Sequence, residues 1–302
     1  MPNTVYAQMD NKQHSTEVLP KESFENEYSG FIIDATEKTG DYVVENAVNE
    51  MSAQGVDTSI LTDGEVPSIA EVSYSNRRSA NYIYKVREDE LKKASVSKEA
   101  FDELKSRIDA NLDEQDKKDC FRQFPKILLS GRASFKTDQI VMDEDATKYA
   151  DILLAIREDL RNIRIPSDKY NSYAKTVGQT TYSLKTFTGR PVVFMRADLY
   201  DAIEINFASG VFNLDKIKLE ADIVRVPTFY SADRQTEDTD VLWLTTGRDF
   251  VRIYKDYEKR ARLEEVRGYN ISKAVTYIEY TSKLVPAIMH TAEASEGNGG
   301  EE

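Results

Sequence analysis

The sequence predicts an α+β fold, and three patterns support this prediction. Apolar residues recur at helical spacing in two segments, one opening at Ser97 and one over residues 144–162. A strand–helix–strand unit occupies residues 191–227, and alternating apolar residues around it are typical of antiparallel strands. With 302 residues, the chain is long enough for one large domain or two ordinary ones.

The first 64 residues are strongly acidic. They hold twelve acidic residues and three lysines, a net charge of −9, and show no sustained apolar period apart from a short helix expected near residues 41–53. We predict an acidic N-terminal arm over residues 1–64, either solvated or docked on a neighbouring subunit. A disordered acidic tail, residues 293–302, adds −4. Since the chain carries −13, residues 65–292 are neutral and lack the basic patch of a dedicated nucleic-acid binder.

Residues 65–94 show the pattern of a long hairpin. Apolar and aromatic residues two apart flank a polar turn at residues 76–79: Val66, Ile69, Val72 and Tyr74 before it, and Tyr82, Tyr84 and Val86 after it. An isolated two-stranded ribbon is only marginally stable in water, so this hairpin is expected to lie on another surface.

Four hairpin residues are candidate assembly contacts: Arg77, Arg78, Tyr82 and Tyr84. The two arginines are expected at the turn, farthest from the core of their own subunit. On a neighbouring subunit they would meet acidic side chains, for example near Glu237 and Asp238. The alternative is a solvated turn and tyrosines that only pack.

The next segment predicts a long amphipathic helix. Ser97 is a suitable N-cap, and Glu99 suits the first turn. A narrow apolar stripe follows, made of Phe101, Leu104, Ile108 and Leu112. Oppositely charged residues four apart are expected on the solvated side: Glu103 with Arg107, Asp113 with Lys117, and Glu114 with Lys118. Pro125 is expected to close this region, and a new unit starts at residues 127–131.

The second half predicts further helices and strands. The helix over residues 144–162, capped by Asp143 or Asp145, turns five residues inward: Ala146, Tyr149, Leu153, Ile156 and Leu160. The strand at 191–195 leads to a helix over 197–207, with Leu199, Ile203 and Phe207 inward, and to a strand at 222–227. A solvated polar loop at 231–240 precedes strands at 241–246, 250–254 and within 274–289.

Residues able to perform chemistry are scarce. The single cysteine, Cys120, excludes an intramolecular disulfide or a cysteine-rich metal site and is expected to be a half-buried packing residue. His14 and His290 lie near the termini, where a rigid catalytic placement is not expected. The turn at residues 130–134 is a weak anion-site pattern, and the acidic pairs Asp143/Asp145 and Glu264/Glu265 are expected to be caps or surface charges.

The sequence holds no phosphate-binding loop and no nucleophile elbow. We therefore predict no catalytic, cofactor-binding or metal-binding residues, and a protein that is not an enzyme. The chain also lacks an apolar run of about 18–20 residues and a secretory leader pattern at its start, so neither a membrane span nor secretion is expected.

Several motifs in this order resemble the major capsid proteins of tailed bacteriophages, which share the Hong Kong 97-like fold. The motifs are AEVSYSNRRSANYIYKV (70–86), KKASVSKEAFDELKSRIDANL (92–112), PKILLSG (125–131), RNIRIPSDKYN (161–171), GRPVVFMRADLYDAI (189–203), DIVRVP (222–227) and VLWLTTGRDFVRIY (241–254). The resemblance covers about residues 60–290. It implies an extended loop over 65–94, a spine helix with the first part of a peripheral domain over 95–142, an axial domain over 143–246, and return strands of the peripheral domain over 247–292.

The resemblance also implies a function. Such a protein self-assembles into an icosahedral shell of pentamers and hexamers that encloses double-stranded DNA in the virion, after assembly in the host bacterial cytoplasm. Portal and scaffolding proteins are the expected partners, DNA is contacted only non-specifically, and no cofactor or membrane is involved. Encapsulin nanocompartment shells, which enclose cargo enzymes, share the fold and a stretch similar to GRDF (247–250), and they are the alternative.

Overall fold

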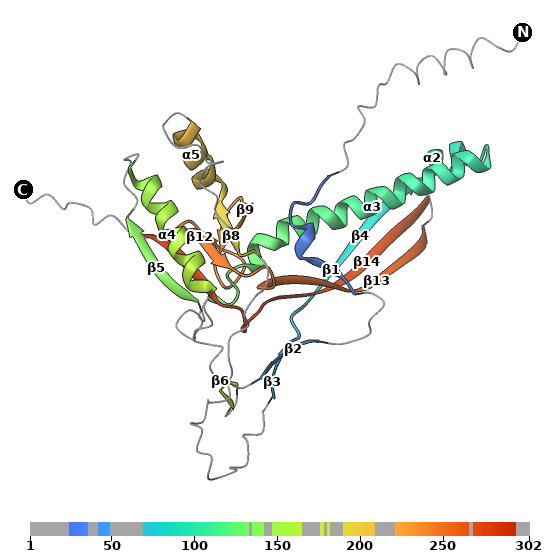
Figure 1. The fold of residues 1–302 in the computed structure, drawn as a ribbon. Coiled ribbons are helices and arrows are strands. Elements are labelled where there is room, and N and C mark those ends of the chain that lie inside the picture. Colours follow the sequence, from blue (N-terminus) through green and yellow to red (C-terminus); the bar gives the residue numbers. More distant parts are fainter. Residues whose placement is uncertain are drawn as a thin grey trace, which may run out of the picture.

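The chain folds into two sheets that share a core at the C-terminal end of one long helix, and a thin ribbon projects from the place where the sheets meet (Figure 1). This computed structural model describes residues 24–35, 42–48, 69–132, 135–141, 147–164, 176–177, 180–181, 190–208, 221–265 and 268–293. Helices and antiparallel strands are both abundant, which confirms the predicted α+β class. No helix in these ranges is long and apolar enough to cross a bilayer.

The central element is the helix α3, Lys98–Ile127. The Ser97 hydroxyl accepts a hydrogen bond from the Ala100 amide at 3.1 Å, which confirms the predicted N-cap. The buried face of α3 advances in steps of four residues: Leu104, Ile108, Leu112, Asp116, Cys120 and Phe124. Phe101 was predicted to belong to this face but is 49% exposed. The residue four positions before Leu104 is Ala100, so Ala100 and not Phe101 continues the buried face toward the start of the helix. Pro125 lies inside the last turn, so α3 ends two residues later than predicted.

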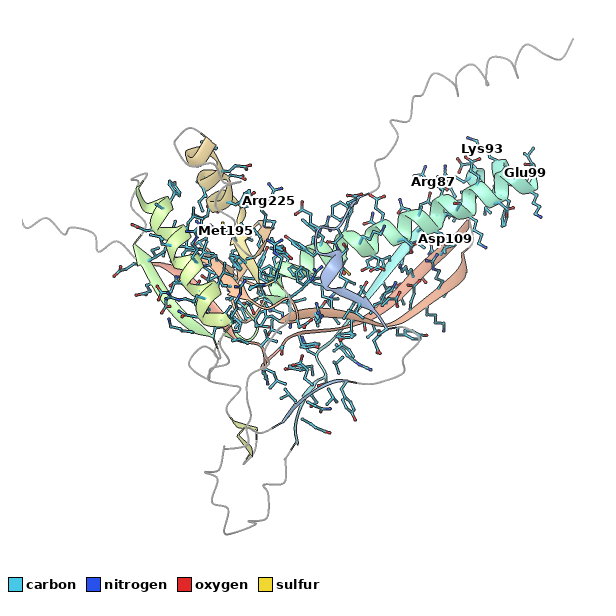
Figure 2. All side chains as sticks on the ribbon, in the orientation of Figure 1. Arg87, Lys93, Glu99, Asp109, Met195 and Arg225 are labelled. Atoms are coloured by element: carbon cyan, nitrogen blue, oxygen red, sulfur yellow. The ribbon has the colours of Figure 1, made fainter. Side chains whose placement is uncertain are left out.

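A long four-stranded sheet covers one side of α3 (Figure 1). Its order is β1 (Ile32–Asp34), β13 (Val251–Glu265), β14 (Gly268–Thr281) and β4 (Arg77–Arg87), and the short helices η1 (Ser29–Phe31) and α2 (Glu88–Ala94) adjoin it. β13 and β14 form an antiparallel hairpin, β4 runs antiparallel to β14, and β1 is parallel to β13. α3 therefore packs on strands that come from distant parts of the chain, and side chains fill the space between the helix and the sheet (Figure 2).

The predicted hairpin within residues 65–94 is wrong. β3 (Ile69–Tyr74) pairs with β2 (Val43–Val48), whereas β4 pairs with β14. The polar segment at 76–79 thus leads from one sheet to another. The physical reason is that the inward residues of β4, such as Tyr84 and Val86, bury against α3, which a local hairpin partner does not offer. The short helix expected near residues 41–53 is also wrong, because residues 43–48 form β2.

The second sheet has five strands, and helices pack on it. Its order is β5 (Lys136–Val141), β15 (Ala287–Glu293), β12 (Val241–Thr246), β8 (Val192–Arg196) and β9 (Asp222–Val226). The predicted strand–helix–strand unit is confirmed as β8, α5 (Ala197–Ala208) and β9, with β8 and β9 parallel. Two short strand pairs, β6 (Thr176–Val177) with β7 (Thr180–Thr181) and β10 (Phe229–Tyr230) with β11 (Glu237–Asp238), complete the described elements.

The helix α4, Thr147–Ile163, packs against this second sheet. Its predicted inward residues Leu153, Ile156 and Leu160 are buried, and Tyr149 is half-buried. Leu199 and Ile203 of α5 are buried as predicted, in the same core as Trp243. The expected caps Asp143 and Asp145, and Ala146, lie outside the described residues, as does the side chain of Phe207.

The buried line of α3 gives a first testable prediction. Ile108→Ala removes a side chain that is buried against Val86 and Leu112, and should lower the free energy of unfolding by about 2–5 kcal/mol. Phe101→Ala removes a half-exposed ring and should cost less than about 1 kcal/mol. Chemical denaturation of the unassembled subunit measures both changes, and equal costs would contradict this placement of α3.

Candidate assembly site

The strands β2 and β3 form a two-stranded ribbon at the surface. Within the described residues, these strands pair with each other and with no strand of the two large sheets. The ribbon leaves the long sheet on the side opposite α3 (Figure 1). Two apolar side chains at its start, Tyr42 directly before β2 and Val44 on β2, are 59% and 38% exposed. A two-stranded ribbon with exposed apolar side chains gains stability when another surface covers it.

The ribbon is attached at its base by a small aromatic cluster. Val72 and Tyr74 of β3 are buried against Ile278 and Tyr280 of β14 and against Leu284. The rings of Tyr74 and Tyr280 stack with centroids 4.0 Å apart. Burial and the nearby Glu45 carboxylate raise the pKa of Tyr74, so its hydroxyl stays protonated and able to donate.

Behind the ribbon lies a charged junction, formed by Arg78, Asp119, Glu279 and Arg234. The Arg78 guanidinium lies 2.5 Å from both Glu279 Oε1 and Asp119 Oδ2, and its carbon lies 4.4 Å from the centre of the Tyr277 ring. Arg234 approaches the other oxygen of Glu279 at 3.1 Å. The Glu279 side chain is 1% exposed, so this carboxylate is buried between two guanidinium groups. The junction therefore ties β4, α3, β14 and the turn after β10 together.

Backbone geometry at the junction supports this contact. Arg234 has a φ of 62°, a left-handed conformation that residues with side chains rarely adopt. The turn that holds it is closed by the Asp233 carboxylate, which accepts a hydrogen bond from the Gln235 amide at 2.9 Å. Hydrogen bonds from Ser231 and from two backbone amides hold the pKa of Asp233 below its usual value. The loop at residues 231–240, which was predicted to be only solvated, thus contains a turn that is closed by hydrogen bonds.

The four predicted contact residues lie on β4 and not at the tip of a hairpin. Arg77 is half-exposed and pairs with Asp256 at 3.1 Å, on the same subunit. Arg78 belongs to the charged junction, and the Tyr82 hydroxyl donates to Asp119 at 2.9 Å. Tyr84 packs, half-buried, on the core under α3. The proposed acidic partner Asp238 is bound within its own chain, by Arg132.

A second charge cluster lies about one turn closer to the N-terminus of α3, around Asp116. Lys273 of β14 is 2% exposed, and its Nζ lies 2.7 Å from Asp116 and 2.8 Å from Asp113. The Tyr277 hydroxyl donates to Asp116, and Lys255 lies 3.4 Å from the same carboxylate. Burial alone would raise the pKa of Asp116, but hydrogen bonds from Lys273 and Tyr277 lower it. No motif in the sequence predicted this cluster, although Asp116 occupies a position on the apolar line of α3.

The remaining candidates are structural. Cys120 was expected to be half-buried but is buried in the core, because it lies on the inward line of α3, and its thiol lies 3.8 Å from Asp116. His290 was expected in a poorly ordered end but lies on β15, because that strand is an internal member of the second sheet. Its ring stacks on Trp243 at 4.2 Å and its Nε2 lies 3.0 Å from Asp159. His14 and the turn residues Ala133 and Ser134 lie outside the described residues, as do the side chains of Glu264 and Glu265.

Burial of Cys120 leads to a second prediction. Burial, followed by the Asp116 charge, raises the pKa of this thiol to about 12, so it remains an unreactive thiol at pH 8. We expect a thiol-specific reagent to modify Cys120 at least about a hundredfold more slowly in the folded subunit than in denaturant. Rapid modification of the folded subunit at pH 8 would contradict the placement of Cys120.

One cleft adjoins the second charge cluster. It has a volume of about 1050 Å³ and lies between residues 24–34, the middle of α3 and β13. Its charged lining includes Asp113 and Asp116, which both pair with Lys273. In the part of the chain that the structure describes, no group of three or more histidine, cysteine or acidic residues could hold a metal ion. In this region the described residues form buried ion pairs beside an open cleft.

The long helix on its four-stranded sheet, the second mixed sheet and the projecting ribbon form an architecture that is also found in solved phage capsids. Solved capsids have the same fold. The capsid of cyanophage P-SCSP1u matches with 12% identity over 93% of this chain and 92% of that chain (TM-score 0.59). The capsid of Staphylococcus phage Andhra matches with 10% identity over 90% of this chain and 85% of that chain, with a TM-score of 0.63. The mature capsid of bacteriophage PhiM1 matches with 10% identity over 89% of this chain and 87% of that chain, with a TM-score of 0.53.

The family itself is identified from the sequence. A model of the Phi29-like phage major capsid protein family matches residues 3–291. The chain therefore belongs to this family, and it is a major capsid protein of a tailed phage. This finding agrees with the resemblance to phage capsid proteins and decides against the encapsulin alternative. No match was found among curated proteins.

Proposed function

We propose that this capsid protein closes into an icosahedral shell through contacts in which the ribbon of one subunit lies on the next subunit. The observation that carries the proposal is the ribbon itself, which leaves the body and exposes Tyr42 and Val44. A ribbon on one subunit and its receiving surface on the next make a heterologous contact, which closes into rings when the rotation is a fifth or a sixth of a turn.

The remaining partners follow from this role. The shell is proposed to contain pentamers and hexamers, with portal and scaffolding proteins as further partners and assembly in the host cytoplasm. Packaged double-stranded DNA would touch the inner surface without sequence preference, in keeping with the neutral charge of residues 65–292. The chain is proposed to perform no catalytic step.

The domain boundaries are adjusted in two respects. We assign residues 24–34 to the body instead of to the N-terminal arm, because Tyr28 and Phe31 are buried in the core and β1 pairs with β13. Because β2 pairs with β3, we assign the extended loop to the ribbon of residues 43–48 and 69–74 instead of to residues 65–94.

We keep four residues of β4 in the proposal and change the roles of three of them: Arg77, Arg78, Tyr82 and Tyr84. Arg77 would contribute its half-exposed charge directly, and the other three would act by holding the body that carries the ribbon.

The test removes the exposed apolar surface of the ribbon. A variant with Tyr42→Asp and Val44→Asp should keep the circular dichroism spectrum and melting temperature of the subunit, because neither side chain is buried. It should lose closed shells in electron micrographs of the purified protein. Ser73→Asp on the same ribbon adds a charge but removes no apolar surface, and shows whether charge alone is responsible. Shells of normal size and yield from the double variant would overturn the proposal.

A further inference from the structure

The ribbon meets the body at three hydrogen-bonding groups that come from three separate segments. Glu45 lies on β2 and Tyr74 on β3, and residues 282–284 follow β14. The Glu45 side chain points toward the body, since Glu45 is only 8% exposed while its neighbours Val44 and Asn46 are exposed. An acidic side chain on the inward face of a marginal ribbon is costly unless hydrogen bonds compensate its burial.

Glu45 receives these hydrogen bonds from both sides of the ribbon base. Its Oε2 accepts from the Tyr74 hydroxyl at 2.9 Å and from the Ser282 hydroxyl at 2.6 Å. The Tyr74 oxygen in turn accepts from the Lys283 amide at 2.8 Å, and the Ser282 oxygen accepts from the Leu284 amide at 3.1 Å. One carboxylate oxygen therefore joins the two ribbon strands to the backbone of the body.

Hydrogen bonds and apolar contacts have different effects on the direction of the ribbon. The stacked rings of Tyr74 and Tyr280 and the side chain of Val72 attach the ribbon, but such contacts tolerate sliding and tilting. Hydrogen bonds weaken steeply when their angle or length changes. Bonds to a charged acceptor are also roughly twice as strong as those between neutral groups.

We propose that Glu45 is the positioning residue of the ribbon, which fixes the angle at which the ribbon leaves the body and thereby the curvature of the shell. This inference rests on the proposed role of the ribbon in assembly. A ribbon held at one angle meets the next subunit in one geometry, whereas a ribbon free to tilt allows several. Loss of Glu45 should therefore yield shells of mixed size or open sheets of subunits.

The test compares Glu45→Ala with Glu71→Ala. Both variants remove one negative charge from the same ribbon, but Glu71 is exposed, and its strand partner is Asn46. Hydrogen exchange of the unassembled subunit reports on ribbon attachment without assembly. In Glu45→Ala the amides of residues 43–48 and 69–74 should exchange at least about tenfold faster, while those of β12 and β14 stay unchanged. Unchanged ribbon exchange would overturn the proposal.

Electron microscopy then measures the diameter and yield of the shells. Glu45→Ala should broaden the diameters or abolish closed shells, and Glu71→Ala should match the natural protein. Tyr74→Phe keeps the stacked ring and removes only the hydroxyl, so it provides the same test if Glu45→Ala does not fold. Shells of natural diameter from both ribbon-base variants would overturn the proposal. If the natural protein itself formed no shells, the proposed function would fail, and faster ribbon exchange in Glu45→Ala would still support the attachment.

Discussion

Arg78→Glu is expected to destabilise the unassembled subunit by about 3–5 kcal/mol. The substitution removes the guanidinium that lies 2.5 Å from Glu279 and Asp119, and places a third carboxylate beside two existing ones. Burial alone would lower the pKa of Arg78, but the Glu279 and Asp119 carboxylates raise it, so the charge is firmly held in the folded state. Arg234 would then be the remaining guanidinium of the charged junction at Glu279.

The matched control is Arg77→Glu, one residue earlier on the same strand. Arg77 is half-exposed and its pair with Asp256 is screened by water, so the cost should stay within about 1 kcal/mol. Urea denaturation monitored by fluorescence gives both values. Equal midpoints for the two variants would mean that the junction does not form. The simple expectation that both arginines are surface residues predicts that equality.

The pairing of β4 explains why the two arginines were misplaced. Two strands with alternating apolar residues around a polar turn are typical of a hairpin, and the alternation of both was correct. Alternation identifies a strand and its faces but not its partner. The partners here are β2 and β14, the latter about 190 residues away along the chain, and no local pattern specifies a pairing over that distance.

The helices were predictable because their signals are local. The cap at Ser97 and the positions of Leu104 and Ile108 depend only on neighbouring residues and on the helical period. The same reasoning misassigned Phe101, since a spacing of three and a spacing of four are equally helical. Only the contacts between α3 and the sheet show which of the two spacings continues the buried face.

Parts of the candidate site carried a signal that sequence reasoning did not use. Asp116 stands where the four-residue line of α3 expects an apolar side chain, and Lys273 stands between the inward residues Ile271 and Val275 of β14. A charged residue at two inward positions suggests a buried ion pair. Glu45 offered no such signal, because it lies in a segment predicted as an acidic arm, either solvated or docked on a neighbouring subunit, and its burial depends on residues 282–284.

Lys273→Met is expected to destabilise the subunit by about 3–5 kcal/mol at neutral pH, because it removes the cation nearest to the buried Asp116 carboxylate. Methionine keeps much of the volume of the lysine stem, so the loss reports mainly on charge. Lys117→Met is the matched control, since Lys117 is exposed on α3 and should cost less than about 0.5 kcal/mol.

The pH dependence of this loss gives the sharper test. The pKa of Asp116 is lowered in the folded state, so its contribution is present above the usual aspartate value of about 3.9 and is lost as pH falls through the lower folded value. Burial alone would lower the pKa of Lys273, but Asp113 and Asp116 raise it, so its contribution is present below about 10.4 and is lost only as pH rises through the higher folded value. The stability difference between the natural subunit and Lys273→Met should therefore stay constant from about pH 5 to 9 and shrink below about pH 4. Denaturation midpoints at pH 3, 5, 7 and 9 measure it, and a difference that persists unchanged at pH 3 would show that the lysine stabilises the fold by packing and not through its charge.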